Sequence, residues 1–277
     1  MSRATRTVLY ASDPSVDQGL IAWHLPGQPG VLVRGGQVQR VPGTHPALGG
    51  GRLAVIRDGA IQVSSTSGPP FNAVIPAPGA DAVAVSARWV AWRVRDGDAD
   101  AVVVAALPAG PARLVLRLEE LGRPVLEGDR LAFHAAGRRG GRIVLADLAA
   151  GTRRVVRRER RALLLNPSLQ GDRLLYVRAH KSRQELRLGP LSRRAPRRDQ
   201  RLWSTTPTGF RDSGYERGRR KSRHNHRRLW RRPRRGLSAS LWTTALAEDA
   251  AYVTRLRQVP GRALVAEILR VDRQAAG

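Results

Sequence analysis

The chain has 277 residues, 42% of them hydrophobic, with a formal net charge of +27 and no cysteine. This length can hold one large domain or two small ones, and the lack of cysteine excludes disulfides, thiolate nucleophiles and cysteine-based metal sites. No apolar run approaches the ~20 residues that a membrane-spanning helix needs, so no membrane span is expected. Arg supplies nearly all of the basic charge, because Lys181 and Lys221 are the only lysines.

The first predicted element is TVLYAS at 7–12, a short β-rich run with no partner strand beside it. Its apolar part is too short for the core of a signal peptide, so the chain as written is expected in the cytoplasm. A start further upstream would instead allow a periplasmic or extracellular location.

One phrase recurs along the whole chain. It is clearest at 128–133 (GDRLAF) and 171–176 (GDRLLY), and alternating segments follow it at 141–148 and 184–191. Alternation of apolar and polar residues is typical of half-buried strands. Four weaker copies have the same form, at 19–24, 51–56, 87–92 and 248–253.

A unit of about 40 residues with several short strands and no helical stripe is typical of a β-propeller blade. The six copies predict an all-β, six-bladed β-propeller in one domain, residues 1–277, with blade repeats at 7–192 and 236–273. We expect the phrase to be an innermost-type strand, and the runs at 112–118 and 161–167 to be third and fourth strands. We expect the N-terminal strand to close the last blade, since that removes free sheet edges. The alternative fold, a β-sandwich or open all-β domain, seldom repeats one strand phrase at such spacing.

The interval between Tyr176 and Tyr252 is nearly twice the usual unit, and residues 193–235 account for the excess. They hold 17 Lys and Arg against three acidic residues, and few aliphatic side chains. This composition predicts a disordered Arg-rich insertion into one blade, apart from a possible short strand at 201–206. Two blades in this interval would give seven in all, but one blade with an insertion fits the unit length better.

The segment at 128–156 resembles the WD-like repeats of TolB-like six-bladed propellers. The positions that carry the resemblance are Gly128, Asp129, Leu131, Ala132 and Phe133, then Ile143, Leu145, Asp147 and Leu148. The resemblance implies a repeat scaffold whose relatives mostly bind other proteins, and whose best-known members work with envelope partners in the periplasm. It transfers no functional residue. Our leading hypothesis is therefore a non-enzymatic, monomeric scaffold for an unidentified protein partner.

The basic insertion carries the second hypothesis. Arginine forks bind phosphates and aromatic rings stack on bases, so the segment predicts non-specific, salt-sensitive binding of nucleic acid or another polyanion, such as an anionic surface. The candidate residues are Arg219, Arg220, Lys221, Arg223, Arg227, Arg228, Trp230, Arg231 and Arg232. The alternative interpretation is a solvated loop whose arginines reflect GC-rich codon usage. A second basic run at 153–161 is interpreted as a strand with an outward arginine face and with Val155 and Val156 directed into the blade.

No catalytic motif occurs, and neither a cofactor nor a metal site is expected. A hydrolase with a site in the axial channel is the third hypothesis, because propellers do host such enzymes. The histidine pair at 224–226 lacks the three or four ligands of a zinc site. The segment DGDAD at 96–100 lacks the Glu that completes a calcium loop, so we interpret it as a hairpin turn. His24 and His134 follow strand aromatics, and we interpret them as solvated strand-end residues and not as channel residues.

Overall fold

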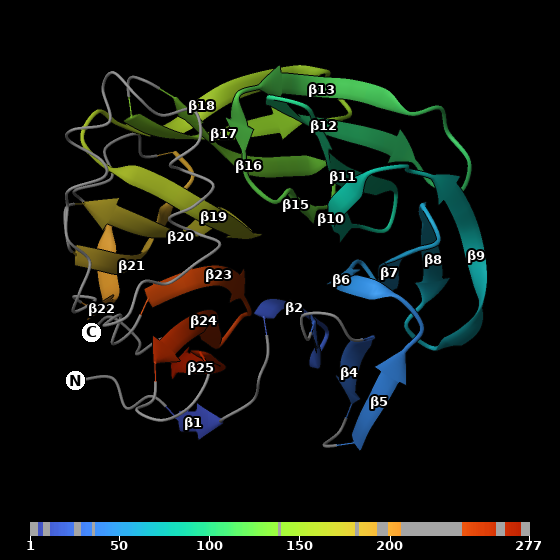
Figure 1. The fold of residues 1–277 in the computed structure, drawn as a ribbon, viewed down its shortest axis with the longest axis horizontal. Coiled ribbons are helices and arrows are strands. Elements are labelled where there is room, and N and C mark those ends of the chain that lie inside the picture. The colour runs from blue at the N-terminus through green and yellow to red at the C-terminus, as the bar shows by residue number, and fades with distance from the viewer. Residues whose placement is uncertain are drawn as a thin grey trace.

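The computed structural model describes residues 5–7, 12–24, 29–34, 37–137, 140–180, 183–192, 199–205, 240–258 and 264–272. These residues form 25 strands in six sheets. Figure 1 shows the sheets as six blades around a central axis, which confirms the all-β six-bladed propeller. The described residues include no helix long and apolar enough to cross a membrane.

Blades 1 to 3 each consist of four consecutive antiparallel strands, ordered from the axis outward. Blade 1 holds β2 (Ser12–Asp17), β3 (Leu20–His24), β4 (Gly30–Arg34) and β5 (Gln37–Val41). Blade 2 holds β6 (Thr44–Gly49), β7 (Arg52–Arg57), β8 (Ala60–Ser65) and β9 (Gly68–Pro76). Blade 3 holds β10 (Ala80–Val85), β11 (Trp89–Asp96), β12 (Ala99–Ala106) and β13 (Arg113–Leu118).

Blades 4 to 6 vary this plan. In blade 4 the innermost position is divided between β14 (Glu120–Leu121) and β15 (Val125–Glu127), followed by β16 (Arg130–Gly137), β17 (Gly140–Asp147) and β18 (Thr152–Glu159). Blade 5 holds β19 (Leu163–Gln170), β20 (Arg173–His180), β21 (Arg183–Pro190) and β22 (Gln200–Thr205). Blade 6 holds β23 (Ser240–Leu246), β24 (Ala250–Gln258), β25 (Leu264–Asp272) and β1 (Thr5–Thr7).

The pairing of β1 with β25 closes the ring, as predicted, with Thr5 opposite Arg270 and Thr7 opposite Ile268. The paired residues begin two positions before the predicted strand at 7–12, and Ser12 already belongs to the innermost strand of blade 1. Figure 1 shows β1 alongside β25 at the outer edge of blade 6. The last blade is therefore built from both ends of the described chain.

The repeated phrase forms the second strand of each blade, so its assignment as an innermost strand is wrong. Phe133 lies in β16 and Tyr176 in β20, and these strands pair on their inner side with β15 and β19. The prediction of a third or fourth strand for 161–167 is also wrong, because this run leads into the innermost strand β19. The run at 112–118 forms β13, a fourth strand, as predicted. Bulges and prolines interrupt the alternation of the innermost strands, which hides them in the sequence.

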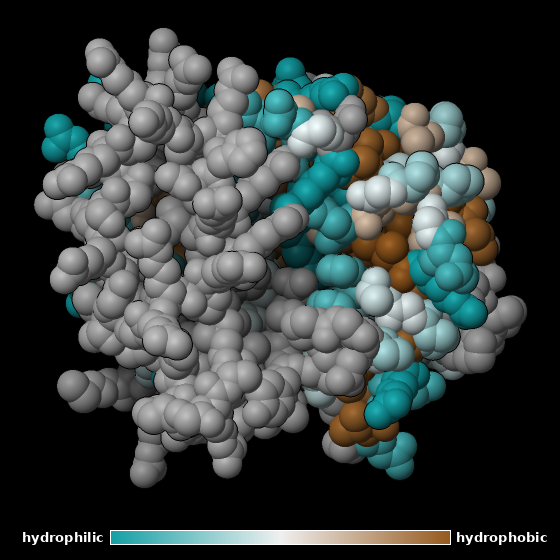
Figure 2. Space-filling view, in the orientation of Figure 1, coloured by the Kyte–Doolittle hydropathy of each residue, from teal (hydrophilic) through white to brown (hydrophobic). Residues whose placement is uncertain are grey.

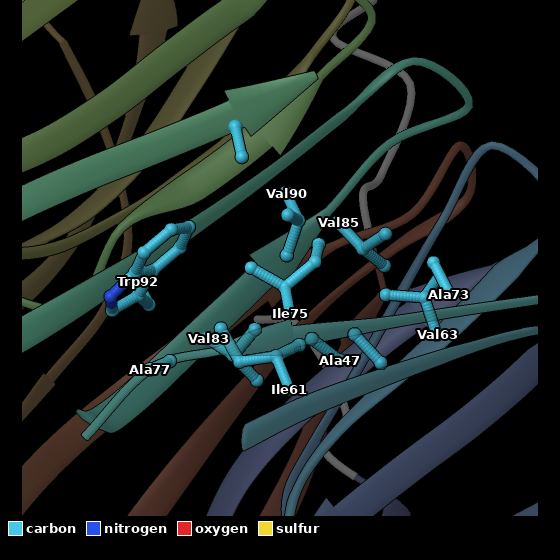
Figure 3. Close-up of a cluster of buried hydrophobic side chains, with 12 residues drawn as sticks. Ala47, Ile61, Val63, Ala73, Ile75, Ala77, Val83, Val85, Val90 and Trp92 are labelled. Carbon is cyan, nitrogen blue, oxygen red and sulfur yellow. The ribbon is translucent and has the colours of Figure 1, made fainter. Parts of the chain in front are cut away.

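The apolar core lies between the blades. Figure 3 shows one such cluster, in which Ile61 and Ile75 of blade 2 pack with Val83, Val90 and Trp92 of blade 3. Because each blade is covered on both faces by its neighbours, the strands can be apolar on both faces and the ring must be complete to exclude water.

Acidic side chains at the ends of two innermost strands join blade 1 to blade 2 and blade 4 to blade 5. Asp17 Oδ2 accepts a hydrogen bond from the backbone N–H of Gly51 at 2.8 Å, and Glu127 Oε1 accepts one from Gly171 at 2.6 Å. Both glycines have positive φ, 72° and 57°, in the turn that follows the innermost strand. Asp129 of the GDRLAF phrase acts similarly, since its Oδ1 accepts from the indole N–H of Trp89 in blade 3 at 2.8 Å.

Residues 199–205, which the sequence places in the insertion, belong to blade 5. The short strand predicted near 201–206 is present as β22, paired with β21. The segments at 193–198 and 206–239 lie outside the described residues.

Candidate functional site: the central channel and the basic rim

The innermost strands of all six blades line a channel along the propeller axis. Its empty volume, including the part open to solvent, is about 580 Å³. The lining residues are mostly small or apolar, and Arg123 is the one charged residue among them. They are Pro14, Ser15, Val16, Ala47, Leu48, Val83, Ala84, Val85, Arg123, Pro124, Val125, Leu126, Asn166, Pro167, Ser168, Leu169, Thr243, Thr244, Ala245 and Leu246.

Each innermost strand is interrupted by a bulge or a break in its pairing. In blade 5 the pairing jumps from Leu165 to Ser168, and in blade 2 it jumps from Thr44 to Ala47. The bulged positions carry His45 and Asn166, whose φ values of 51° and 48° are positive. In three blades a proline follows the polar bulge residue, since proline at a bulge loses no ladder hydrogen bond.

The second strand of one blade supports the bulge of the next. His24 of blade 1 stacks on His45 of blade 2, with ring centroids 4.4 Å apart. In blade 4, His134 Nδ1 accepts a hydrogen bond from the backbone N–H of Asn166 in blade 5 at 3.0 Å. Arg93 of blade 3 donates to the carbonyl of Leu121 in blade 4 at 3.0 Å. In three blades, the residue at the same position of the second strand thus contacts the innermost strand of the next blade.

The interpretation of His24 and His134 as solvated residues is wrong, because both are buried, with 8% and 7% of their surface exposed. Burial, together with the charge of Arg93, lowers the pKa of His134 to about 3. His134 is therefore neutral at physiological pH, which lets Nδ1 accept the bond from Asn166. Gly122 must be glycine here, since a Cβ would overlap the His134 ring.

Hydroxyl groups in the channel wall are engaged in bonds between blades. Ser15 Oγ accepts from the N–H of Leu48 at 2.8 Å, and Ser168 Oγ accepts from the N–H of Leu246 at 2.9 Å. Thr244 Oγ1 donates to the carbonyl of Asn166 at 2.5 Å. These side chains hold the ring together around the channel.

The described residues offer few side chains in the channel that could act in acid–base catalysis or bind a metal ion. The channel lining there contains no Asp, Glu or His, and no three described His, Asp or Glu side chains converge as metal ligands would. The segment at 96–100 forms the hairpin turn predicted for it, with Asp96 opposite Ala99. Asp100 is buried and accepts from the N–H of Leu121 at 3.0 Å, so it is a structural carboxylate.

The arginine strand at 153–161 forms β18, the outermost strand of blade 4, as predicted. Val156 is buried and Val155 is half-buried, whereas Arg153, Arg154 and Arg158 are exposed. We call the five exposed arginines of this strand and its following turn the basic rim. They are Arg153, Arg154, Arg158, Arg160 and Arg161.

Arg157 is the exception in this strand, because its side chain is fully buried. It donates to both carboxylate oxygens of Asp199 at 2.7 and 3.2 Å, and to the carbonyl of Pro190 at 2.8 Å. Asp199 also accepts from the hydroxyl of Tyr176 at 2.9 Å. Burial and the neighbouring Asp199 charge raise the pKa of Tyr176, so its hydroxyl keeps its proton and donates. Sequence reasoning missed this cluster, since Asp199 lies among insertion arginines and no local pattern marks it.

A second ion cluster joins blades 4 and 5 beside the rim. Arg178 donates to Glu159 at 2.5 and 2.8 Å and reaches Glu185 at 3.4 Å. Its bonds to Glu159 raise the pKa of Arg178 against the effect of burial. Burial would raise the pKa of Glu185, but Arg187, Arg178 and Arg183 outweigh it and lower that pKa. Arg178 and Glu185 are therefore both charged at neutral pH, and they pair with each other.

All nine residues of the predicted polyanion site, Arg219 to Arg232, lie outside the described residues, as does the histidine pair at 224–226. The strands that flank this segment are described. Before the segment, Thr205 ends β22 opposite Gln184; after it, Leu241 in β23 lies opposite Arg255. Both flanks therefore lie at the edge of the ring where the second and third strands of blades 5 and 6 are joined. Arg160 and Arg161 follow β18 at the same edge, since the Arg161 carbonyl lies 2.6 Å from His180 Nδ1.

No protein-family model matches the chain, and no curated protein matches it. Among solved structures it is similar to TolB from Acinetobacter baumannii, with a TM-score of 0.55 and 12% identity over 92% of this chain and 64% of that one. The putative TolB from Agrobacterium tumefaciens gives a TM-score of 0.53 and 11% identity over 72% and 82%. The acylaminoacyl peptidase of Pyrococcus horikoshii gives a TM-score of 0.54 and 10% identity, over 95% of this chain and 46% of the peptidase chain.

The chain therefore spans less than two thirds of the Acinetobacter TolB and less than half of the peptidase. Identities this low establish the fold and leave the activity open. The closed ring of six blades, the closing N-terminal strand and the match to two TolB structures agree with one another. The chain is a six-bladed β-propeller with a TolB-like fold.

Proposed function

We propose that the chain is a non-enzymatic binding propeller whose protein partner contacts the mouth of the central channel. The observation that carries this proposal is the lining, to which every blade contributes apolar side chains and backbone beside the single cation Arg123. Apolar walls with a few convergent polar groups are typical of binding sites. A guanidinium in such a wall favours a partner segment that carries a carboxylate.

The likeness to TolB structures supports a binding scaffold, and the likeness to a peptidase makes hydrolysis the rival function. The scaffold explains the site better, because the described channel lining has neither a carboxylate nor a histidine to act as general acid or base. Its hydroxyls at Ser15 and Ser168 are occupied by bonds between blades.

A paired substitution tests the channel mouth. Val125 lines the channel and is half-buried, whereas Val38 on β5 is 69% exposed at the outer edge of blade 1. Val125→Arg adds a charge inside the channel, and Val38→Arg adds the same charge outside it. A partner captured from native extract and then purified should bind the Val125→Arg protein at least tenfold more weakly, by calorimetry, and bind the Val38→Arg protein as it binds wild type. Equal affinity for all three folded proteins would overturn the proposal.

The non-enzymatic part has its own test. Purified protein incubated with a panel of chromogenic esters and peptides should give no turnover above background. Turnover that Val125→Arg abolishes and Val38→Arg preserves would replace the scaffold with a channel hydrolase.

The basic segment at 193–235 supports a second candidate function, polyanion binding. The positive charge of the segment favours polyanion binding, and so does the position of its described flanks beside the basic rim. Deleting residues 209–235 should leave the circular dichroism of the propeller unchanged and weaken salt-sensitive binding to heparin and DNA. Unchanged binding after the deletion would remove this segment from consideration.

A further inference from the structure

The described arginines fall into two groups. One group is paired with carboxylates, as in Arg93 with Asp81, Arg157 with Asp199 and Arg255 with Glu267. The second group is exposed and forms no ion pair with any carboxylate in the described ranges, and it includes Arg154 and Arg158. Pairing is thus the structural use of arginine in this fold, and the second group needs another explanation.

The second group is concentrated on one outer strand. β18 and the turn after it carry six arginines, of which only Arg157 is buried. β18 itself has four arginines, whereas of the other outermost strands β13 has two, β1, β5 and β22 have one each, and β9 has none. Codon usage acts on all outer strands alike, so it does not explain why the arginines gather on blade 4.

A like-charge pair marks the centre of the patch. Arg158 in β18 lies directly opposite Arg142 in β17, on the same face of the sheet. Side chains directly opposite on antiparallel strands have Cβ atoms about 5 Å apart, and like charges there destabilise the sheet. Neither arginine has a described carboxylate partner that would neutralise it, because Glu159 pairs instead with Arg178.

We propose that β18 is a binding surface for the phosphodiester backbone of nucleic acid, with one phosphate held between Arg142 and Arg158. Two forked guanidiniums this close can together bind one phosphate and so relieve their repulsion. Arg153 lies opposite Ala146 and so shares a face of the sheet with Arg142 and Arg158, whereas Arg154 lies opposite Leu145 on the other face. Arg160 is exposed in the bend that follows the strand. The site is formed by described residues alone and does not depend on the proposed channel function.

The arrangement favours a linear polyanion over a membrane. Arg153 and Arg158 lie on one face of a single extended strand, which rises about 3.3 Å per residue, and such a row suits phosphates repeated along a chain. Membrane-surface elements combine cations with exposed large apolar side chains. Among the described residues, the exposed large hydrophobics are Val38, Val74 and Leu114, and none belongs to blade 4. Figure 2 shows the apolar residues of this face on the right-hand side, over blades 1 to 3.

Two triple variants of the full chain test the proposal. Arg142→Gln/Arg158→Gln/Arg160→Gln removes the rim charges, and Arg40→Gln/Arg57→Gln/Arg173→Gln removes the same charge from blades 1, 2 and 5. The probe is a fluorescent single-stranded DNA oligonucleotide, titrated over a range of salt concentrations. The rim variant should bind at least tenfold more weakly. It should lower the slope of log K against log salt by about 1.4, at about 0.7 for each of the two phosphates that the variant no longer neutralises. The control should match wild type.

Three outcomes would overturn the proposal. The first is an equal loss of DNA affinity in both variants, which would make net charge the cause. The second is unchanged DNA affinity in the rim variant. The third is binding of phosphatidylserine vesicles in preference to the oligonucleotide. A stability measurement separates the site from a structural role. The single change Arg142→Gln should raise the melting temperature without DNA and reduce the further rise that DNA gives, because it removes repulsion and a phosphate-binding group together. A lower melting temperature without DNA would mean that Arg142 is structural.

Discussion

At the residue scale, the most informative side chains are charged groups that the fold has removed from water. Arg157, Asp199 and Tyr176 form a buried cluster that ties β18 of blade 4 to β22 of blade 5. Gly189 makes room for it, because a Cβ there would overlap the Asp199 carboxylate. A buried charge pair stabilises only while both partners and their hydrogen bonds are present.

Asp199→Ala should therefore destabilise the protein strongly. It leaves the Arg157 guanidinium buried without its counter-charge, which costs about 3–5 kcal/mol. Urea unfolding followed by circular dichroism would measure the loss. The double variant Arg157→Leu/Asp199→Leu should recover a large part of it, since both charges are then gone. A double variant no more stable than Asp199→Ala would show that the cluster is needed for its hydrogen bonds.

His134 should make stability depend on pH. Its pKa is lowered to about 3 in the folded protein by burial and by Arg93, against 6.5 for an ordinary histidine. The folded state binds this proton less well than the unfolded state, so stability is complete above pH 6.5 and falls as the pH drops towards 3. The loss is on the order of 1 kcal/mol per pH unit.

His134→Gln should flatten this dependence, because the amide oxygen can accept the bond from Asn166 and does not titrate. Chemical unfolding between pH 7 and pH 5 would compare the two proteins. An equal slope in both would assign the pH dependence to other groups.

At the scale of elements, the innermost strands differ most from the regular pattern. Five of them carry a bulge in their pairing, and in blade 4 the strand is divided into β14 and β15. The irregular strands of blades 2, 4 and 5 turn polar groups towards the preceding blade, whose second strand contacts them through His24, Arg93 and His134 respectively. The bulges are therefore the joints between blades.

The closing strand β1 is short, and its pairing with β25 can be tested by one change. Arg6 lies opposite Leu269 in this pair. Arg6→Pro removes a backbone N–H and restricts the strand, so the melting temperature should fall and the exposed edge of β25 should promote association. Calorimetry and size-exclusion chromatography would detect both effects. Arg6→Ala keeps the backbone groups and should behave as wild type; an equal effect of both changes would mean that the side chain closes the ring.

At the scale of the whole molecule, the clusters between blades make the ring a single cooperative unit. Tyr176 of blade 5 packs with Ala132 and Ile143 of blade 4, and Trp92 of blade 3 packs with Ile61 of blade 2. A blade released from the ring would expose both of its apolar faces. No blade should therefore be stable alone.

We expect one unfolding transition for the whole propeller. Tryptophan fluorescence reports on blades 1, 3, 5 and 6, and far-UV circular dichroism reports on all strands. The tryptophans in the described strands are Trp23, Trp89, Trp92, Trp203 and Trp242. The two signals should have the same urea midpoint. Separate midpoints would show that part of the ring unfolds on its own.

The sequence predicted the number of blades and the closure of the ring because the second strands are regular. Phe133 and Tyr176 stand at the same place in alternating strands, and alternation is visible in one sequence. The channel was beyond prediction, because its walls come from strands that bulges make irregular. The contact of His134 with Asn166 joins residues from different blades and leaves no local pattern.

The closure of blade 6 has a consequence for synthesis on the ribosome. Of the described strands, β1 is made first and its partner β25 is made last. Through most of translation β1 therefore lacks its partner strand, and each newly made blade packs only against the blade made before it. Until β25 has left the ribosome the ring stays open, and its free sheet edges can pair with those of another chain.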